Sequence, residues 1–576
     1  MKRSLLFLLL CISLSTPLLG DVDLKTGDFY ISYTDLDFTA IKGIALERTY
    51  NSASTTTGLF GRGWTSVYET RLYVIGDGNL LIREVGSSCK TCAENGSGNA
   101  SILIRERGLF ELFFTPSAPN QARIDAAVAQ LIPLLIRDRR LENTPLAIAT
   151  KRKELLASMS QRAAAWITYT EKGWLAPAQA PQNTSWFSTN GELQNIARTA
   201  EGFTRTYNNG SLERFDAQGL LLNKYDDKGK LAFEITYSAG KISQILDGVG
   251  TLFRFELNAQ GLVSTVEAKG ETIRYRYNEH HCLLESTGTD KQKRHYAYNS
   301  QHMLERIAQA DETISITYDP RSQRVSQVSE ADEEGLQKLD RFSYTKLLKE
   351  DGSVDPYRFA TFKITGMDEY IDSTYNEYEL REILGRPYTY RTLIRQSYAT
   401  TETIFTECGC GPLSIKRGQK WATFAYDGKS RMILKENNEY ILRAAYNDEL
   451  GKITRVERTD KYSGKITISE FDYSPQGDVV EMRSEELTIR LAYDEHRKII
   501  KMESPSATLY FAYNSIQKPS KIRMEGGGQI NVTYDERGEI EKVDSPDGHS
   551  MALKVTQAFQ NLLTVAKPQG FDYKLN

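Results

Sequence analysis

Four of the cysteines stand in two close pairs, an arrangement that can bind a metal ion or form disulfides. Cys89 and Cys92 enclose two residues, and Cys408 and Cys410 enclose a single glycine. Two thiolate pairs can hold zinc tetrahedrally, but the oxidising compartment of an exported protein favours disulfides. We expect disulfides, with zinc as the alternative, and cross-pairing of the two motifs, because a bond within Cys408–Cys410 would close a strained ring. Cys282 stands where comparable segments carry an apolar residue, and we expect a buried free thiol or small hydrophobe there.

Paired carboxylates are the other candidate chemistry. Asp368 and Glu369, or Glu377 and Glu379, could imitate the acid and nucleophile of a glycosidase, although acidic residues are common on any solvated surface. The six histidines show no metal-ligand spacing. The sequence contains neither a G-x-S-x-G nucleophile motif nor a phosphate-binding glycine loop. We therefore assign no catalytic residue, cofactor-binding residue or metal ligand, and we expect a non-enzymatic protein that needs no cofactor.

The first twenty residues indicate export. Lys2 and Arg3 form a positive start, residues 5–12 are apolar, and Gly20 ends a plausible cleavage site. This pattern is typical of a secretory signal peptide. No later apolar run approaches the length of a transmembrane helix. We expect a secreted, periplasmic or cell-surface protein without a membrane span.

Composition narrows the class further. The chain has 576 residues, 72 Lys and Arg against 75 Asp and Glu, and a hydrophobic fraction of 40%. These values describe a folded chain, too long for one ordinary core. A net charge of −3 gives no electrostatic support for nucleic-acid binding. The 32 tyrosines and 41 glycines favour strands joined by tight turns.

A repeat of about twenty residues dominates the chain. Each unit is an alternating strand that ends in Tyr-Asp or Tyr-Asn, then a turn, then an apolar restart. The signature pairs are Tyr225-Asp226, Tyr277-Asn278, Tyr298-Asn299, Tyr318-Asp319, Tyr426-Asp427, Tyr446-Asn447, Tyr493-Asp494, Tyr513-Asn514 and Tyr534-Asp535. Twenty residues suit one β-hairpin, and hairpins that are unstable alone must pair edge to edge into a long, twisted sheet. We expect the Asp or Asn to bind turn amides, and the tyrosine to keep its ring in the sheet and its hydroxyl near water.

These repeats resemble the YD repeats of the RHS family, which includes bacterial RHS proteins, shell components of insecticidal toxin complexes, and teneurins. The segments 23–29, 48–52 and 58–64 are similar to the region that precedes such repeats in many bacterial RHS proteins, with Trp64 as an expected core anchor. The resemblance implies a β-strand spiral that forms a hollow shell, which encloses a toxic polypeptide or displays surfaces for recognition. The D-P-x-G motif at which many members cut themselves is not visible, and few residues follow Ile540. We therefore expect neither self-cleavage nor a toxin domain in this chain, and an open or partial shell.

Two segments interrupt the repeats. In residues 118–167, two helical stretches (120–139 and 145–166) predict an inserted helical hairpin. Pro133 should kink the first helix, whose apolar face is expected at Ala126, Ala129, Ile132 and Leu135. The hairpin should cover the sheet, with partner docking as the alternative. Tyrosines in 346–420 without a clean period predict another turn of sheet with degraded repeats, although exposed tyrosines could also bind sugars or proteins.

The fold class that follows is mainly β: a YD-repeat hairpin array that forms a spiral sheet or partial shell with an inserted α-helical hairpin. The expected segments are a signal peptide (1–20), an RHS-type β domain (21–117), the helical insertion (118–167), a first run of repeats (185–345), the irregular segment (346–420), a second run (421–545) and a tail (546–576). The expected function is an exported scaffold for surface recognition or adhesion, with a protein or carbohydrate partner. The alternatives are a shell that encloses or delivers a separate toxin polypeptide and, less favoured, a cell-surface glycan hydrolase.

Overall fold

The computed structural model describes most of the chain. The described residues are 20–41, 43–87, 107–116, 120–180, 184–189, 193–289, 292–367, 370–383, 386–396, 398–407, 409, 411–485, 487–505, 507–515, 518–534, 540–544 and 572–575. The predicted signal peptide up to residue 19 and the four paired cysteines (Cys89, Cys92, Cys408 and Cys410) lie outside these residues. Export and the choice between disulfide and zinc therefore stay predictions.

The N-terminal segment forms a small sheet of its own, in the order β1-β2-β3-β6. Its strands are β1 (Asp21–Val22), β2 (Phe29–Asp37), β3 (Ala45–Asn51) and β6 (Trp64–Thr65), with the 3-10 helix η1 (Thr39–Ile41) between β2 and β3. A two-stranded ribbon of β4 (Thr57–Gly58) and β5 (Gly61–Arg62) precedes β6, and the 3-10 helix η2 (Val67–Glu69) follows it. Trp64 is fully buried, as expected for a core anchor.

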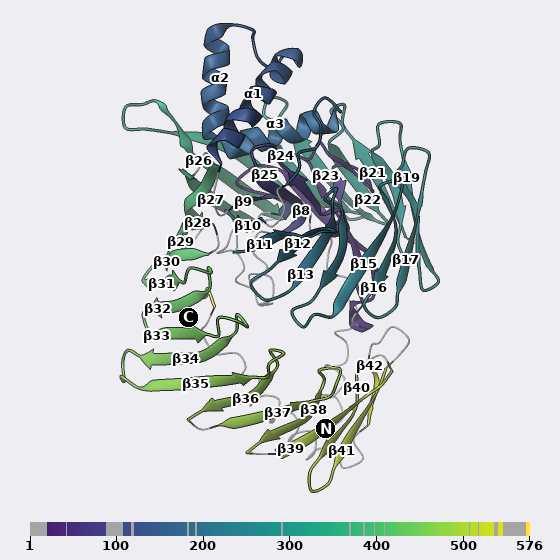
Figure 1. The fold of residues 1–576 in the computed structure, drawn as a ribbon, viewed down its shortest axis with the longest axis vertical. Helices are drawn as coiled ribbons and strands as arrows, with labels where there is room; N and C mark the ends of the chain where they lie inside the picture. Colours follow the sequence, from purple (N-terminus) through teal and green to yellow (C-terminus); the bar gives the residue numbers. More distant parts are fainter. Residues whose placement is uncertain are drawn as a thin grey trace.

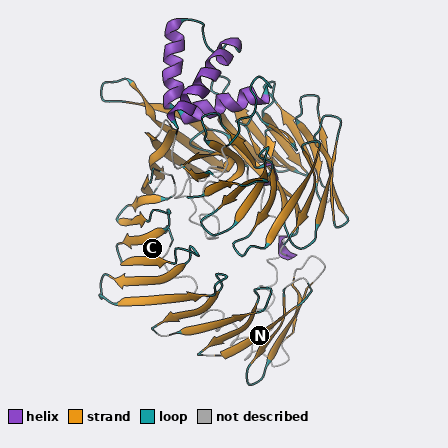
Figure 2. Cartoon of the chain, viewed as in Figure 1, coloured by secondary structure: helices purple, strands orange, loops and turns teal. Residues whose placement is uncertain are grey.

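The rest of the described chain is dominated by one antiparallel sheet, in which each strand from β7 to β42 pairs with the next one along the chain (Figures 1 and 2). The strands before and within the first run are β7 (Arg71–Val74), β8 (Leu80–Ser87), β9 (Arg107–Pro116), β10 (Ser185–Ser188), β11 (Asn195–Arg198), β12 (Gly202–Thr206), β13 (Leu212–Asp216), β14 (Leu221–Tyr225), β15 (Leu231–Ser238), β16 (Lys241–Asp247), β17 (Leu252–Leu257), β18 (Val263–Ala268), β19 (Glu271–Tyr277), β20 (Leu283–Thr287), β21 (Lys293–Tyr298), β22 (Leu304–Gln309), β23 (Glu312–Tyr318) and β24 (Val325–Asp332). The predicted mainly-β array of hairpins paired edge to edge is confirmed.

Longer strands carry the sheet through the Tyr-rich segment into the second run. They are β25 (Gly335–Leu348), β26 (Val354–Met367), β27 (Tyr370–Ile383), β28 (Arg386–Gln396) and β29 (Ala399–Phe405). The second run comprises β30 (Pro412–Arg417), β31 (Lys420–Tyr426), β32 (Met432–Asn437), β33 (Tyr440–Tyr446), β34 (Ile453–Asp460), β35 (Ile466–Tyr473), β36 (Val479–Ser484), β37 (Thr488–Tyr493), β38 (Ile499–Ser504), β39 (Ala507–Tyr513), β40 (Pro519–Met524), β41 (Gln529–Tyr534) and β42 (Ile540–Asp544). The sheet passes through residue 345 without interruption, since this residue lies inside β25.

A β-bulge at almost every signature tyrosine bends the sheet. The pairing register shifts between Arg276 and Tyr277 in the β19–β20 pair, and between Ala492 and Tyr493 in the β37–β38 pair. Bulges increase the right-handed twist of a strand pair, so their repetition makes the sheet curl. The first residue of β7, Arg71, forms an isolated β-bridge with Leu220, which directly precedes β14. The second run bends back beneath the first (Figure 1).

The helical insertion has three helices, not the predicted two: α1 (Gln121–Arg137), α2 (Pro145–Ala157) and α3 (Met159–Glu171). The predicted second helix divides at Ser158, which has extended φ and ψ angles and whose hydroxyl accepts from the amide of Gln161. Serine caps a new helix in this way. The helix α1 runs on through Pro133 to Arg137.

The buried face of α1 also differs from the prediction. Ala126 and Ala129 are exposed, whereas Ala127, Val128, Leu131 and Leu135 are buried. The larger Val and Leu side chains determine which face is buried, because burying them removes more apolar surface from water. This face packs on Ile75, which follows β7, and on Leu81 of β8 and Phe113 of β9. The insertion therefore covers one side of the sheet (Figure 2).

The main core lies between the N-terminal sheet and the first run. Phe29, Ile31 and Trp64 share one buried cluster with Phe253, Ile273 and other side chains of the first run. The second run has its own cluster, which contains Leu442, Ile489 and Leu509. Tyr277, Tyr298 and Tyr318 pack against the first cluster and Tyr493 against the second, while Tyr426 packs against a third cluster around Ile415. The apolar face of the sheet on which these signature tyrosines lie is called here the tyrosine face.

Candidate functional site

Seven of the nine signature tyrosines bind the main chain of a neighbouring strand. Tyr277, at the end of β19, donates its hydroxyl to the carbonyl oxygen of Val263 at 2.8 Å. Equivalent bonds of 2.6–2.8 Å run from Tyr237 to Leu221, Tyr318 to Leu304, Tyr344 to Val325, Tyr426 to Pro412, Tyr446 to Met432, Tyr473 to Ile453, Tyr493 to Val479, Tyr513 to Ile499 and Tyr534 to Pro519. The sequence predicts only that these hydroxyls lie near water; it does not indicate that they donate to the first carbonyl of a neighbouring strand.

Two signature tyrosines lie differently. The hydroxyl of Tyr298 accepts a hydrogen bond from the indole nitrogen of Trp64 at 3.0 Å. The ring of Tyr225 lies against the guanidinium of Arg214, 5.2 Å from its centroid. Elsewhere burial raises the tyrosine pKa, to about 12 for Tyr446 and Tyr473.

The Asp or Asn that follows a signature tyrosine binds backbone amides of the turn. The side-chain oxygen of Asn278 accepts from the amides of His280 and Cys282 at 3.0 and 2.9 Å. Turn amides are bound in the same way by Asp226, Asn299, Asp319, Asp427, Asn447, Asp494 and Asn514, which is the role expected from the sequence. Asp535 lies outside the described residues.

The N-terminal segment binds the same apolar restart residues from the other side. The amides of Val263 and Val325 donate to the carbonyls of Leu59 and Gly27 at 2.9 and 2.8 Å, and the amide of Leu304 donates to the hydroxyl of Tyr50. The carbonyls of these three restart residues are the ones that accept tyrosine hydroxyls. Three repeats of the first run are therefore fastened to the N-terminal segment.

A buried ion pair lies at the centre of this contact. The guanidinium of Arg48 donates from Nε to Asp35 at 2.7 Å, and both side chains are fully buried. Arg48 also donates to the hydroxyls of Ser286 and Tyr296, while Tyr275 donates to Asp35. Burial opposes the charge on Arg48, but Asp35, Tyr296 and Tyr275 together outweigh burial and raise the pKa of Arg48. Sequence analysis missed this pair. The pattern that could have indicated it is an acidic residue, Asp35, at a core-facing position of β2 and a basic residue, Arg48, at a core-facing position of β3.

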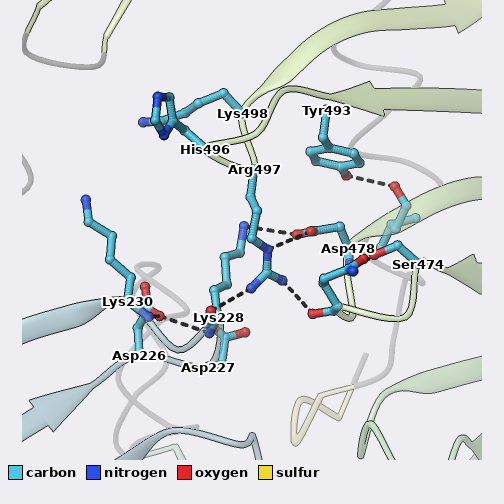
Figure 3. A network of polar contacts seen from close by, with 12 residues as sticks. Asp226, Asp227, Lys228, Lys230, Ser474, Asp478, Tyr493, His496, Arg497 and Lys498 are labelled. Atoms are coloured by element: carbon cyan, nitrogen blue, oxygen red, sulfur yellow. Dashed lines mark hydrogen bonds and ion pairs between the residues drawn. The ribbon is translucent and has the colours of Figure 1, made fainter.

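A second contact, called here the seam, joins turns of the first run to turns of the second (Figure 3). Arg497, between β37 and β38, donates to Asp478 at 2.7 Å and to the carbonyl of Lys228 at 2.7 Å. Lys228 lies 3.5 Å from the other carboxylate oxygen of Asp478. Two further links are the Lys452–Asp227 ion pair at 3.2 Å and the hydrogen bond from the side-chain amide of Asn208 to the carbonyl of Lys429.

The charges at the seam stabilise one another. Burial opposes ionisation of Asp478, yet hydrogen bonding and charge from Arg497, with Lys228, lower its pKa. Arg497 adopts a left-handed backbone with φ of 60°, which a non-glycine residue adopts at a cost. The two runs therefore meet through charged side chains rather than through an apolar core, an arrangement that can open without exposing much apolar surface.

Replacing Arg497 by Gln should loosen the seam. Asp478 would keep only Lys228, and removing a charged hydrogen-bond partner from a nearly buried carboxylate costs about 1–3 kcal/mol. We expect a larger hydrodynamic radius and a lower urea midpoint than in the wild type. The difference should shrink at high salt, because salt also screens the Arg497–Asp478 pair of the wild type. Arg490→Gln is the control, since Arg490 is exposed and pairs with Glu481 inside the second run. Equal radii for the two variants would contradict a seam that holds the runs together.

The other residues singled out by chemistry are not brought into one site. Asp368 and Glu369 lie outside the described residues. Glu377 pairs with Arg358 at 2.7 Å and with Arg391 at 3.7 Å, and Glu379 pairs with Arg381. Cys282 is a buried free thiol, as predicted.

Two kinds of feature are absent from the described part of the chain. In that part, no group of three or more His, Cys, Asp or Glu side chains is placed to hold a metal ion. The helices described there include none that is long and apolar enough to cross a membrane.

Two segments match family models. Residues 20–90 match a family described as a domain of unknown function (DUF6531), and residues 396–575 match the teneurin YD-shell family. No curated protein sequence matches the chain. The first match covers the N-terminal sheet and the start of the large sheet, and the second covers the second run.

Solved structures of toxin complexes are similar to this chain at low identity and low TM-score. The crystal structure of TcdB2-TccC3-Cdc42 has 10% identity over 88% of this chain, with a TM-score of 0.36. The Tc holotoxin pore of Photorhabdus luminescens, which carries a TccC3 mutation, has 9% identity over 87% of this chain and a TM-score of 0.26. The matched regions make up 27% and 34% of those chains, so this chain spans about a third of their length or less.

Proposed function

We propose that this chain, which matches the teneurin YD-shell family over residues 396–575, is an exported, non-enzymatic scaffold of the RHS/YD-repeat family whose β-shell presents a recognition surface to a partner at the cell surface. The shell itself is the mainly-β sheet described above. The proposed partner is a protein or a carbohydrate. The function then depends on shape and on displayed side chains, not on a reacting group.

The projecting end of the β25–β26 hairpin carries this proposal. Leu348 and Val354 pair across its end and are 58% and 51% exposed, and Tyr357 beside them is 43% exposed. The hairpin extends beyond its neighbours beside the helical insertion (Figure 1). Clustered apolar side chains on a projecting surface are typical of a binding site. Aliphatic residues beside one tyrosine favour a protein partner over a sugar, which would need more aromatic and polar groups.

Binding of the purified mature protein to cells and to a glycan array tests this function. The double variant Leu348→Ser/Val354→Ser should weaken binding at least about tenfold, as expected for loss of about 1.4 kcal/mol or more. Leu146→Ser/Tyr462→Ser is the matched control, because these side chains are even more exposed but lie on separate elements. Equal binding by both variants, or no binding by the wild type to either surface, would refute the proposed surface.

One observation favours the second candidate, a shell that encloses a separate polypeptide. Residues 572–575 lie against the tyrosine face of β31 and β32, where Leu575 is buried with Ile415 and Phe424. The buried amine of Lys435 pairs with Asp572 at 3.0 Å. This face therefore accommodates a short segment of chain in addition to the sheet. The N-terminal segment occupies the equivalent face of the first run.

Protease protection distinguishes enclosure from display. An unfolded reporter polypeptide fused after Asn576 should resist digestion if the shell encloses it, and should become sensitive in Arg497→Gln, where the seam is loosened. The same fusion with Arg490→Gln should stay protected. A reporter that is cut equally in all three proteins would exclude enclosure and leave display as the function.

A further inference from the structure

A cationic cavity opens at the seam, beside the Arg497 contact. Its volume is about 500 Å³, and its lining combines Lys230, Gly248, Val249 and Lys269 of the first run with Glu495 to Lys498 and Ser515 of the second, closed at one side by Ile41. This volume lies within the range of small-molecule sites, about 300–1,000 Å³. The cavity is therefore large enough for one compact ligand that touches both runs.

The charge of this lining is strongly one-sided. Lys230, Lys269, Arg497 and Lys498 contribute four positive charges, whereas Glu495 is the one carboxylate among the lining residues. The chain as a whole is slightly acidic, so a local excess of cations does not follow from composition. The neighbouring carboxylates are engaged elsewhere. Asp226, Asp247 and Asp494 accept from backbone amides of their own turns, whereas Asp227 pairs with Lys452 and Asp478 pairs with Arg497.

The cations are held in place by different means. Arg497 is fixed by three hydrogen bonds, to Asp478 and to the carbonyls of Lys228 and Gln476. Lys269 lies over the ring of Phe38, and Lys498 lies over the ring of Tyr513. A contact of this kind positions an ammonium group over the face of a ring. Figure 3 shows Lys230 and the pair His496–Lys498 on opposite sides of the open space next to Arg497.

We propose that this cavity binds a small multivalent oxyanion, with several phosphate or sulfate groups on one molecule, and that the bound anion links the two repeat runs. A single-charged ion would engage only one of the cationic edges, whereas several charged groups on one molecule reach both. Because the lysines come from separate runs, binding energy is available only when the seam is closed. The ligand therefore stabilises the closed shell by mass action.

Two probes separate the possible sources of this chemistry: inorganic tripolyphosphate and inositol hexasulfate, titrated by calorimetry into the mature full-length protein at constant ionic strength. We expect saturable binding of at least one probe with one site per chain, and an increase in melting temperature on saturation. Binding of tripolyphosphate alone identifies a phosphate ligand, and binding of the hexasulfate alone identifies a sulfated one. Absence of saturable binding by either probe overturns the proposal.

Variants on each side of the seam test the bridging. Lys230→Gln/Lys269→Gln on the first run and Lys498→Gln on the second should each weaken binding at least about tenfold and abolish the rise in melting temperature. Lys153→Gln/Lys349→Gln removes two exposed lysines outside the cavity and should bind as tightly as the wild type. An equal loss in this control would show nonspecific attraction, and an effect from one run alone would show a site that does not bridge. Either result overturns the proposal.

Discussion

Replacing Arg48 by Met should destabilise the protein by about 3–5 kcal/mol, as is typical when one partner of a buried ion pair is removed. The carboxylate of Asp35, fully buried, would keep the hydroxyl of Tyr275 but lose its compensating charge. The hydroxyls of Ser286 and Tyr296, which accept from Arg48, would also lose a donor. Chemical denaturation followed by tryptophan fluorescence measures the loss, because Trp64 lies directly beneath the guanidinium.

The matched control is Arg276→Met. Arg276 is largely exposed and pairs with Glu285 on the outer side of the sheet, and an exposed pair contributes at most about 1 kcal/mol. Arg48→Met should also make the N-terminal sheet more sensitive to limited proteolysis, since its contact with β19, β20 and β21 depends on this network. A denaturation midpoint for Arg48→Met equal to that of Arg276→Met would show that the ion pair does not hold the N-terminal sheet.

The repeat could be predicted from the sequence because its signals are local. The alternation that ends in Tyr493 and Asp494 predicts both a strand and a turn, and the structure has β37 and an amide-binding Asp494 there. Residue type predicts that Trp64 lies in the core, and its position in the repeat predicts the same for Cys282; both are buried.

The features that sequence reasoning missed depend on residues far apart in the chain. Arg497 and Lys228 are 269 positions apart, and no local pattern indicates that the curling sheet brings their turns together. The burial of Arg48 could not be predicted, because a charged residue in a strand is usually exposed. Its burial depends on partners in β2, β20 and β21. The division of the second helix at Ser158 shows the same limit on a smaller scale, since a serine tolerated within a helix can equally begin a new one.

The protein should unfold steeply as the pH rises from 10 toward 12. Burial raises the pKa of Tyr446, Tyr473 and Tyr493 from 10.0 to about 12, and each hydroxyl donates to a main-chain carbonyl. A folded-state pKa above the unfolded value means that this stabilisation is complete below pH 10. It is lost progressively as the pH approaches the folded-state value, because the unfolded state releases the phenolic proton first.

The effect is large because the same bond recurs along both runs. Phenolate absorbance and circular dichroism, followed together through the titration, should change in one coincident transition. Gradual ionisation near pH 10 with unchanged circular dichroism would contradict the prediction, since it would show that the hydroxyls ionise without breaking the sheet.

A triple variant isolates the contribution of the hydroxyls. Tyr446→Phe/Tyr473→Phe/Tyr493→Phe should lose about 0.5–1.5 kcal/mol per hydrogen bond at neutral pH, yet its stability should fall less steeply above pH 10, because three titrating donors are gone. Tyr398→Phe/Tyr462→Phe, at two highly exposed positions, should reproduce the wild-type curve. The rings stay in place in both variants, so any difference in slope belongs to the hydroxyl bonds that join one repeat to the next. An unchanged slope in the triple variant would mean that alkaline unfolding begins elsewhere in the chain.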